Sequence, residues 1–217
     1  MRKERNEVGG KGACVNRQIP LRSSSVKTPD RTTAAAFPRY AVGEAVADSN
    51  ALQWRGIFVR RYRFPRVVDR FLVPATPEPL ITCQLAGSAE FRERDIGKAW
   101  VTRQLQRGDA FVTRSKVPYE TCWSSPAGQE LDVIIIHLAV DQFRAALEAV
   151  YPGKADSVKV IDFFGHDEAL AQVCFACAEM LATRVPGASK RVAALVQLLA
   201  AYPVSYTHLT LPTNREV

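Results

Sequence analysis

The sequence lacks the long apolar segments that mark membrane-spanning and secreted proteins. No apolar run approaches the roughly 18 residues of a membrane span, and the N-terminus has no signal-peptide core. The five cysteines are an odd number at irregular spacing, which argues against a disulfide framework. We therefore expect a cytoplasmic protein without a membrane partner. With 217 residues and 47% apolar composition, the chain is long enough to bury a core in one or two domains.

Clustered positive charge is also missing from the N-terminal segment, although the formal net charge of the chain is +7. Residues 1–50 hold 9 Lys and Arg against 5 Asp and Glu, so more than half of the excess lies in this segment. It has no apolar periodicity and is rich in turn-forming residues, which predicts a disordered basic tail. Because its charges are scattered, a solvated extension explains the segment better than an arm that binds DNA.

Short strands dominate residues 78–137. Ile81, Cys83 and Leu85 alternate with polar residues, as in a half-buried strand. Turns that contain glycine separate such runs at intervals of about 10 residues. This spacing predicts a small antiparallel β-barrel or sandwich over residues 51–150, which can close around a small molecule.

The order of these elements resembles a family of regulators. AWVTRQLQRGDAFVTRSKVPYETCW (99–123) and LDVIIIHLAVDQFRAAL (131–147) look like the cupin-like sensor half of AraC-type (arabinose-regulator-like) transcriptional regulators. The segment 167–202 resembles the helices that link this sensor to the DNA-binding half. The resemblance implies an α+β fold, in which a cupin-like double-stranded β-helix precedes an α-helical hairpin.

The resemblance also implies a function. Such a domain senses a small-molecule effector, forms a homodimer and controls transcription. The family's C-terminal pair of helix-turn-helix units has no counterpart in this sequence. We therefore expect DNA binding only through a domain that is absent from the chain.

A stand-alone cupin enzyme, such as an isomerase or a dioxygenase, is the alternative. A metal site of that class needs about three imidazoles and a carboxylate. The chain has only His137, His166 and His208, without a His-x-His pair, and Tyr119 stands where many cupins place a ligand histidine. We therefore expect no metal, no cofactor and no catalytic residue.

Candidate pocket residues follow from the closed sheet, in which every second residue of a strand faces inward. Aromatic side chains with polar tips and an imidazole suit a ligand site. The sequence indicates Trp100, Tyr119, Trp123 and His137, with Arg70 as the anchor for an anionic group. His137 is alternatively a core imidazole with one hydrogen-bond partner.

Arginines gather around GIFVRRYRF (56–64), where Phe58, Tyr62 and Phe64 share one strand face and are predicted to pack inward. Most of these arginines are then expected at the rim or in solvent. One alternative is a nucleic-acid-binding surface on which these aromatic rings stack against bases. Another is that one of the arginines points into the barrel and binds a carboxylate or sugar hydroxyls.

Residues 151–203 are predicted to form a linker and a helical hairpin, with Asp167 and Ser189 as N-caps. Cys174 and Cys177 lie in an apolar helical stripe, so we interpret them as small apolar residues and not as a redox or zinc motif. The hairpin is predicted to mediate dimerisation. The interface residues are Leu170, Val173, Cys177, Leu181, Leu195 and Leu199.

Pro203 is predicted to end the last helix. The next ten residues, VSYTHLTLPT (204–213), match a translation of a common sequencing adapter residue for residue. We therefore expect residues 204–217 to be a non-native tail that takes no part in the fold.

Overall fold

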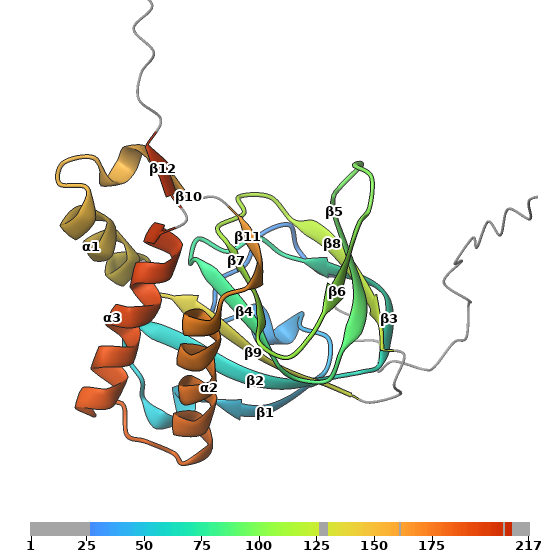
Figure 1. Cartoon of the computed structure of the whole chain (residues 1–217), viewed down its shortest axis with the longest axis horizontal. Helices are drawn as coiled ribbons and strands as arrows, with labels where there is room; N and C mark the ends of the chain where they lie inside the picture. The colour runs from blue at the N-terminus through green and yellow to red at the C-terminus, as the bar shows by residue number, and fades with distance from the viewer. Residues whose placement is uncertain (1–26, 126–129, 161, 206, 210–217) are drawn as a thin grey trace, which may run out of the picture.

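The computed structural model describes residues 27–125, 130–160, 162–205 and 207–209. Two antiparallel sheets face each other, and three α-helices lie at one side of them (Figure 1). Among the described residues, no helix is both long and apolar enough to cross a membrane.

The larger sheet has six strands in the order β1-β2-β9-β4-β7-β11. Their bounds are β1 (Glu44–Asp48), β2 (Ile57–Phe64), β9 (Leu131–Leu138), β4 (Leu80–Ala86), β7 (Asp109–Thr113) and β11 (Phe163–His166). The smaller sheet has the order β3-β8-β5-β6. Its strands are β3 (Val67–Val73), β8 (Tyr119–Ser124), β5 (Ala89–Asp95) and β6 (Val101–Leu105). The predicted antiparallel sandwich is thus confirmed.

The larger sheet is buried on both faces. Val59 of β2 pairs with Ile136 of β9, and both side chains lie in an outer core under the helices. Tyr62 pairs with Val133, and both lie in an inner core between the sheets. This double burial explains why β9 carries a continuous run of apolar residues instead of a polar-apolar alternation.

The helices are α1 (Val140–Val150), α2 (Glu168–Ala182) and α3 (Lys190–Ser205). Asp167 Oδ1 accepts a hydrogen bond from the Leu170 N–H at 2.9 Å, and Ser189 Oγ accepts one from the Arg191 N–H at 3.1 Å. Both predicted N-caps are therefore confirmed. Figure 1 shows α2 and α3 against the larger sheet, where their apolar faces complete the outer core.

The prediction of a disordered tail over residues 1–50 is wrong for residues 27–50; residues 1–26 lie outside the described residues. The short 3-10 helix η1 (Phe37–Arg39) buries Phe37 in the inner core, and β1 pairs with β2. A second 3-10 turn, η2 (Ser49–Leu52), connects these strands. One buried aromatic ring and one strand are enough to order a segment of unremarkable composition.

The C-terminal end also differs from the prediction. Helix α3 continues through Pro203 to Ser205, and Val204 is buried with Phe143 and Leu147 of α1. A proline in the last turn removes one backbone hydrogen bond, which the burial of Val204 offsets. The 3-10 turn η3 (Ala155–Ser157) leads into β10 (Val158–Val160). Strand β10 pairs with β12 (Thr207–Leu209) in a separate two-stranded sheet. Residues 204, 205 and 207–209 thus belong to the fold.

Candidate ligand site between the sheets

A cavity of about 90 Å³ lies between the two sheets. Apolar and aromatic side chains supply most of its wall, and they come from both sheets, from η1 and from β11. The residues are Phe37, Phe64, Phe71, Val73, Leu80, Phe91, Leu105, Ala110, Phe111, Trp123, Leu131, Val133, Ile135 and Phe164, with Thr82, Gln84, Asp109, Tyr119 and Thr121 as polar members. Such a wall suits an apolar body with few polar contacts.

A wider polar recess of about 300 Å³ adjoins this cavity at the β5–β6 edge. Phe111, Tyr119 and Phe164 line both spaces and form an aromatic partition. The ring centroid of Phe111 lies 6.0 Å from that of Tyr119 and 6.4 Å from that of Phe164. The recess itself is lined by charged groups, among them Arg103 and Glu93.

Two of the charged groups in the recess form an ion pair. Arg103 Nε donates to Glu93 Oε1 at 3.1 Å, and its guanidinium lies 4.6 Å above the Phe164 ring. Burial raises the pKa of Glu93, an effect that Arg103 opposes. Burial also raises the pKa of Tyr119, as do Glu93 and Asp162, so the phenol stays neutral at physiological pH.

Two of the five predicted pocket residues reach the cavity. Tyr119 lines it, and so does Trp123, whose indole N–H donates to the Pro65 carbonyl at 2.9 Å. Trp123 also stacks on Phe64 with ring centroids 5.2 Å apart. These contacts hold the indole plane against the cavity.

Trp100 and Arg70 do not reach the cavity. Trp100 precedes β6. The guanidinium carbon of Arg94 lies over its indole ring, 4.4 Å from the centroid of that ring. The Arg70 side chain is 70% exposed and pairs with Glu120 on the outside of the smaller sheet. Arg94 and Arg70 together hold the pKa of Glu120 below its ordinary value. The assignment of Arg70 as an inward anchor is therefore wrong, because its strand register turns it to solvent.

His137 lies inside the barrel, but it does not line the cavity. The Phe37 ring stands 5.0 Å from the imidazole and itself lines the cavity. Burial, with a contribution from Arg60, lowers the pKa of His137 to about 3, so the ring is neutral near pH 7. The expectation of one hydrogen-bond partner is wrong for the described residues, in which neither ring nitrogen has one.

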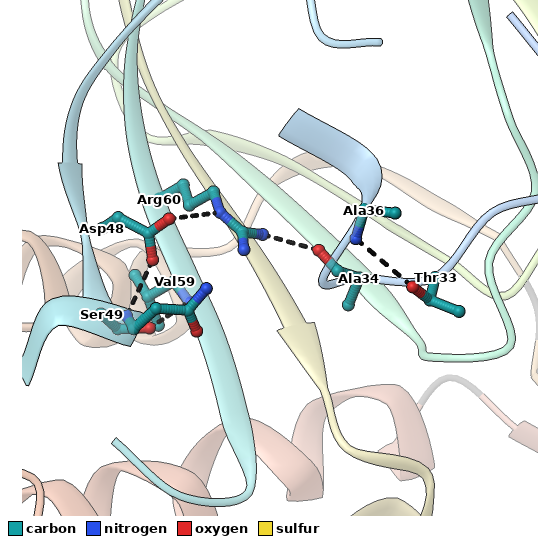
Figure 2. Close-up of polar contacts among 8 residues, drawn as sticks. Thr33, Ala34, Ala36, Asp48, Ser49, Val59 and Arg60 are labelled. Carbon is teal, nitrogen blue, oxygen red and sulfur yellow. Dashed lines mark hydrogen bonds and ion pairs between the residues drawn. The ribbon is translucent and has the colours of Figure 1, made fainter. Parts of the chain in front are cut away.

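Arg60 is the interior residue that the sequence prediction did not single out. It is 1% exposed, its Nε donates to Asp48 Oδ2 and its Nη1 donates to the Ala34 carbonyl, both at 2.8 Å (Figure 2). The signal was present in the strand alternation, since Arg60 shares a face with Tyr62 and Phe64.

The residues predicted to form a dimer interface pack within a single chain instead. Leu170, Cys177 and Leu199 are fully buried, and with Leu181, Leu195 and Val173 they pack in or against the outer core. The interface assignment is therefore corrected to intramolecular packing. The apolar interpretation of Cys174 and Cys177 is confirmed, and burial raises the pKa of the Cys177 thiol.

Comparison with known proteins identifies the fold. No protein-family model and no curated protein sequence match the chain. Among solved structures, ToxT from Vibrio cholerae matches with a TM-score of 0.52 and 10% identity, over 74% of this chain and 61% of ToxT. ToxT bound to unsaturated fatty acid matches with a TM-score of 0.51 and 10% identity, over 75% of this chain and 56% of that one.

Another solved neighbour is the AraC-like transcriptional activator CuxR, with a TM-score of 0.47 and 11% identity over 70% of this chain and 53% of CuxR. The chain thus spans about three fifths of the length of the ToxT structures that it matches. At these identities the likeness concerns the fold. The fold of this chain is that of the part of ToxT that it matches, which agrees with the fold that the resemblance implied.

Proposed function

We propose that this chain is the ligand-sensing part of an AraC-type transcriptional regulator, and that it takes an apolar small molecule between its two sheets. The cavity walled by aromatic and aliphatic side chains is the observation that supports this proposal most directly. The solved neighbours include ToxT and the AraC-like transcriptional activator CuxR, which favours a sensor over a catalyst.

The class of ligand follows from the cavity and agrees with the structural neighbours. ToxT structures contain an unsaturated fatty acid or (E)-4-(8-methylnaphthalen-1-yl)but-3-enoic acid. Both are carboxylic acids with an apolar body. We propose a ligand of the same class here, because nearly all of the cavity wall is apolar.

The effect on transcription is part of the same proposal. A ligand changes a regulator only if it binds one state of the protein more tightly than another. DNA recognition is proposed to reside in a helix-turn-helix domain beyond these residues, and homodimerisation to use surfaces other than the buried faces of α2 and α3.

Filling the cavity tests the proposal. The variant Val133→Phe places a phenyl ring in the cavity, whereas Val101→Phe makes the same change at a position that is 47% exposed. Calorimetric titration with dodecanoate is expected to give a 1:1 complex for the unmodified chain and for Val101→Phe, and at least tenfold weaker binding for Val133→Phe. Equal binding by all three proteins would contradict a ligand site between the sheets.

A further inference from the structure

Three polar side chains lie on the inner face of the larger sheet, with Arg60 between Tyr62 and His137. Arg60 and Tyr62 are alternate residues of β2, and His137 lies on β9, two residues from the Arg60 partner Ile135. Side chains at alternate and diagonal positions of paired strands are neighbours on one face. All three side chains are at most 1% exposed.

These side chains carry buried polar atoms that the protein does not satisfy. Arg60 Nη2, Tyr62 Oη and both ring nitrogens of His137 have no hydrogen-bond partner within the described part of the chain. The large majority of buried side-chain polar atoms in folded proteins have one. Four such atoms, on Arg60 and on the two side chains that flank its position, indicate a recognition site for a polar group.

Phe37 connects the cavity to this polar cluster. It lines the cavity, and its ring centroid lies 5.0 Å from that of His137. The segment around η1 is held over the cluster by the Arg60 Nη1–H, which donates to the Ala34 carbonyl (Figure 2). If the Phe37 ring moves aside, the apolar cavity and the polar cluster become one continuous space.

The donors define the group that fits. Arg60 presents guanidinium N–H groups, Tyr62 a hydroxyl, and neutral His137 one ring N–H. A carboxylate accepts at about four lone-pair sites and pairs readily with a guanidinium fork. Asp48 already accepts from Arg60 Nε, so the fork keeps its Nη1 and Nη2 groups for the ligand once the Ala34 carbonyl is released.

We propose that Arg60, Tyr62 and His137 form the carboxylate-binding end of the ligand site, and that Phe37 and the Ala34 carbonyl close this end until the ligand displaces them. The inference rests on the proposed function and makes it specific. The ligand is a monocarboxylic acid whose apolar body fills the cavity. Its head group competes with the Ala34 carbonyl for Arg60, so binding shifts the N-terminal segment of the domain.

The test compares dodecanoate with dodecanol, which has the same chain and no charge, by calorimetric titration of the full chain. The unmodified protein is expected to bind the acid at least tenfold more tightly than the alcohol. Tyr62→Phe removes a single hydroxyl, and it is expected to weaken acid binding about tenfold while leaving alcohol binding unchanged. Arg60→Gln is expected to abolish the preference for the acid, whereas Arg70→Gln, at the exposed arginine, keeps it.

The outcomes separate this inference from the proposed function. If the chain binds acid and alcohol equally, and Tyr62→Phe changes neither, the carboxylate site is wrong and the apolar cavity still binds a ligand. If neither compound binds, the proposed function fails as well. Tyr62→Phe decides the question if Arg60→Gln does not fold, because it deletes one oxygen without adding volume.

Phe37→Ala tests the closing ring separately. Stopped-flow fluorescence is expected to show association of dodecanoate faster on the order of tenfold, since the binding-competent state no longer requires the ring to move. Unchanged or slower association would show that Phe37 is a fixed part of the wall.

Discussion

The two faces of the larger sheet serve different purposes, although the same strands build both. On the outer face, Val59, Ile134 and Ile136 pack against α2 and α3 among apolar side chains and buried thiols. On the inner face, Arg60 and His137 are buried without full hydrogen bonding, and a cavity remains between the sheets. The outer face provides stability, and the inner face gives up some packing and polar satisfaction for recognition.

The largest effect is expected from a charge in the outer core. Leu195→Asp buries a carboxylate among apolar groups and is expected to cost more than about 4 kcal/mol, which unfolds a domain of ordinary stability. Leu198→Asp, on the same helix at 53% exposure, is the control and is expected to change stability by about 0.5 kcal/mol or less. Urea denaturation measures both. A folded Leu195→Asp protein that merely changes from dimer to monomer in sedimentation would restore the interface assignment.

Acid is expected to lower the free energy of unfolding, because unfolding allows the buried His137 to take up a proton. Its pKa is lowered to about 3 in the folded state against about 6.5 when unfolded, so below pH 6.5 the unfolded chain binds the proton first. Stability from this group is complete above pH 6.5 and falls by about 1.4 kcal/mol per pH unit until the folded pKa is reached. At pH 5 the loss is about 2 kcal/mol.

Denaturation between pH 7 and pH 5 measures this loss. His137→Leu is expected to flatten the pH dependence, whereas His166→Gln, at a histidine whose side chain is 51% exposed, keeps it. The same slope in both variants would assign the acid sensitivity to carboxyl groups instead.

Two variants that each add one methylene group allow the packing of the two faces to be compared. Val133→Ile extends into the cavity and is expected to cost less than about 1 kcal/mol, whereas Val59→Ile in the outer core is expected to cost about 1–3 kcal/mol. Thermal unfolding of the two variants measures the difference. Equal costs would mean that the inner face is packed as tightly as the outer one.

The smallest effect concerns thiol chemistry. Cys174 and Cys177 are fully buried, and burial raises the pKa of Cys177, so little thiolate forms there. In a Cys14→Ser protein, an aromatic disulfide reagent is expected to react with these thiols only at the rate of unfolding. Rapid modification of the native protein would show that the outer core opens more readily than the inner one.

Local sequence pattern was sufficient for the strands, the N-caps and the antiparallel sandwich, whereas the cupin-like fold was an expectation from the family resemblance. Local pattern did not predict side-chain orientations that depend on contacts with residues far away in the sequence. Arg60 lies inward because Asp48 and the Ala34 carbonyl accept hydrogen bonds from its guanidinium group, and both belong to a segment whose composition suggested disorder. The stripe on α2 and α3 has the same pattern whether it meets a sheet or a second subunit, so only the structure assigns it to the outer core.

The three tryptophans allow the most direct test of the account. Trp54 lies in the outer core, Trp100 lies beneath arginines outside the cavity, and Trp123 lines the cavity. In protein labelled with 5-fluorotryptophan, titration with dodecanoate is expected to shift the Trp123 ¹⁹F resonance saturably at 1:1 stoichiometry, with the Trp54 resonance unchanged. Saturable shifts of Trp54 or Trp100 with a stationary Trp123 resonance would contradict a ligand site between the sheets.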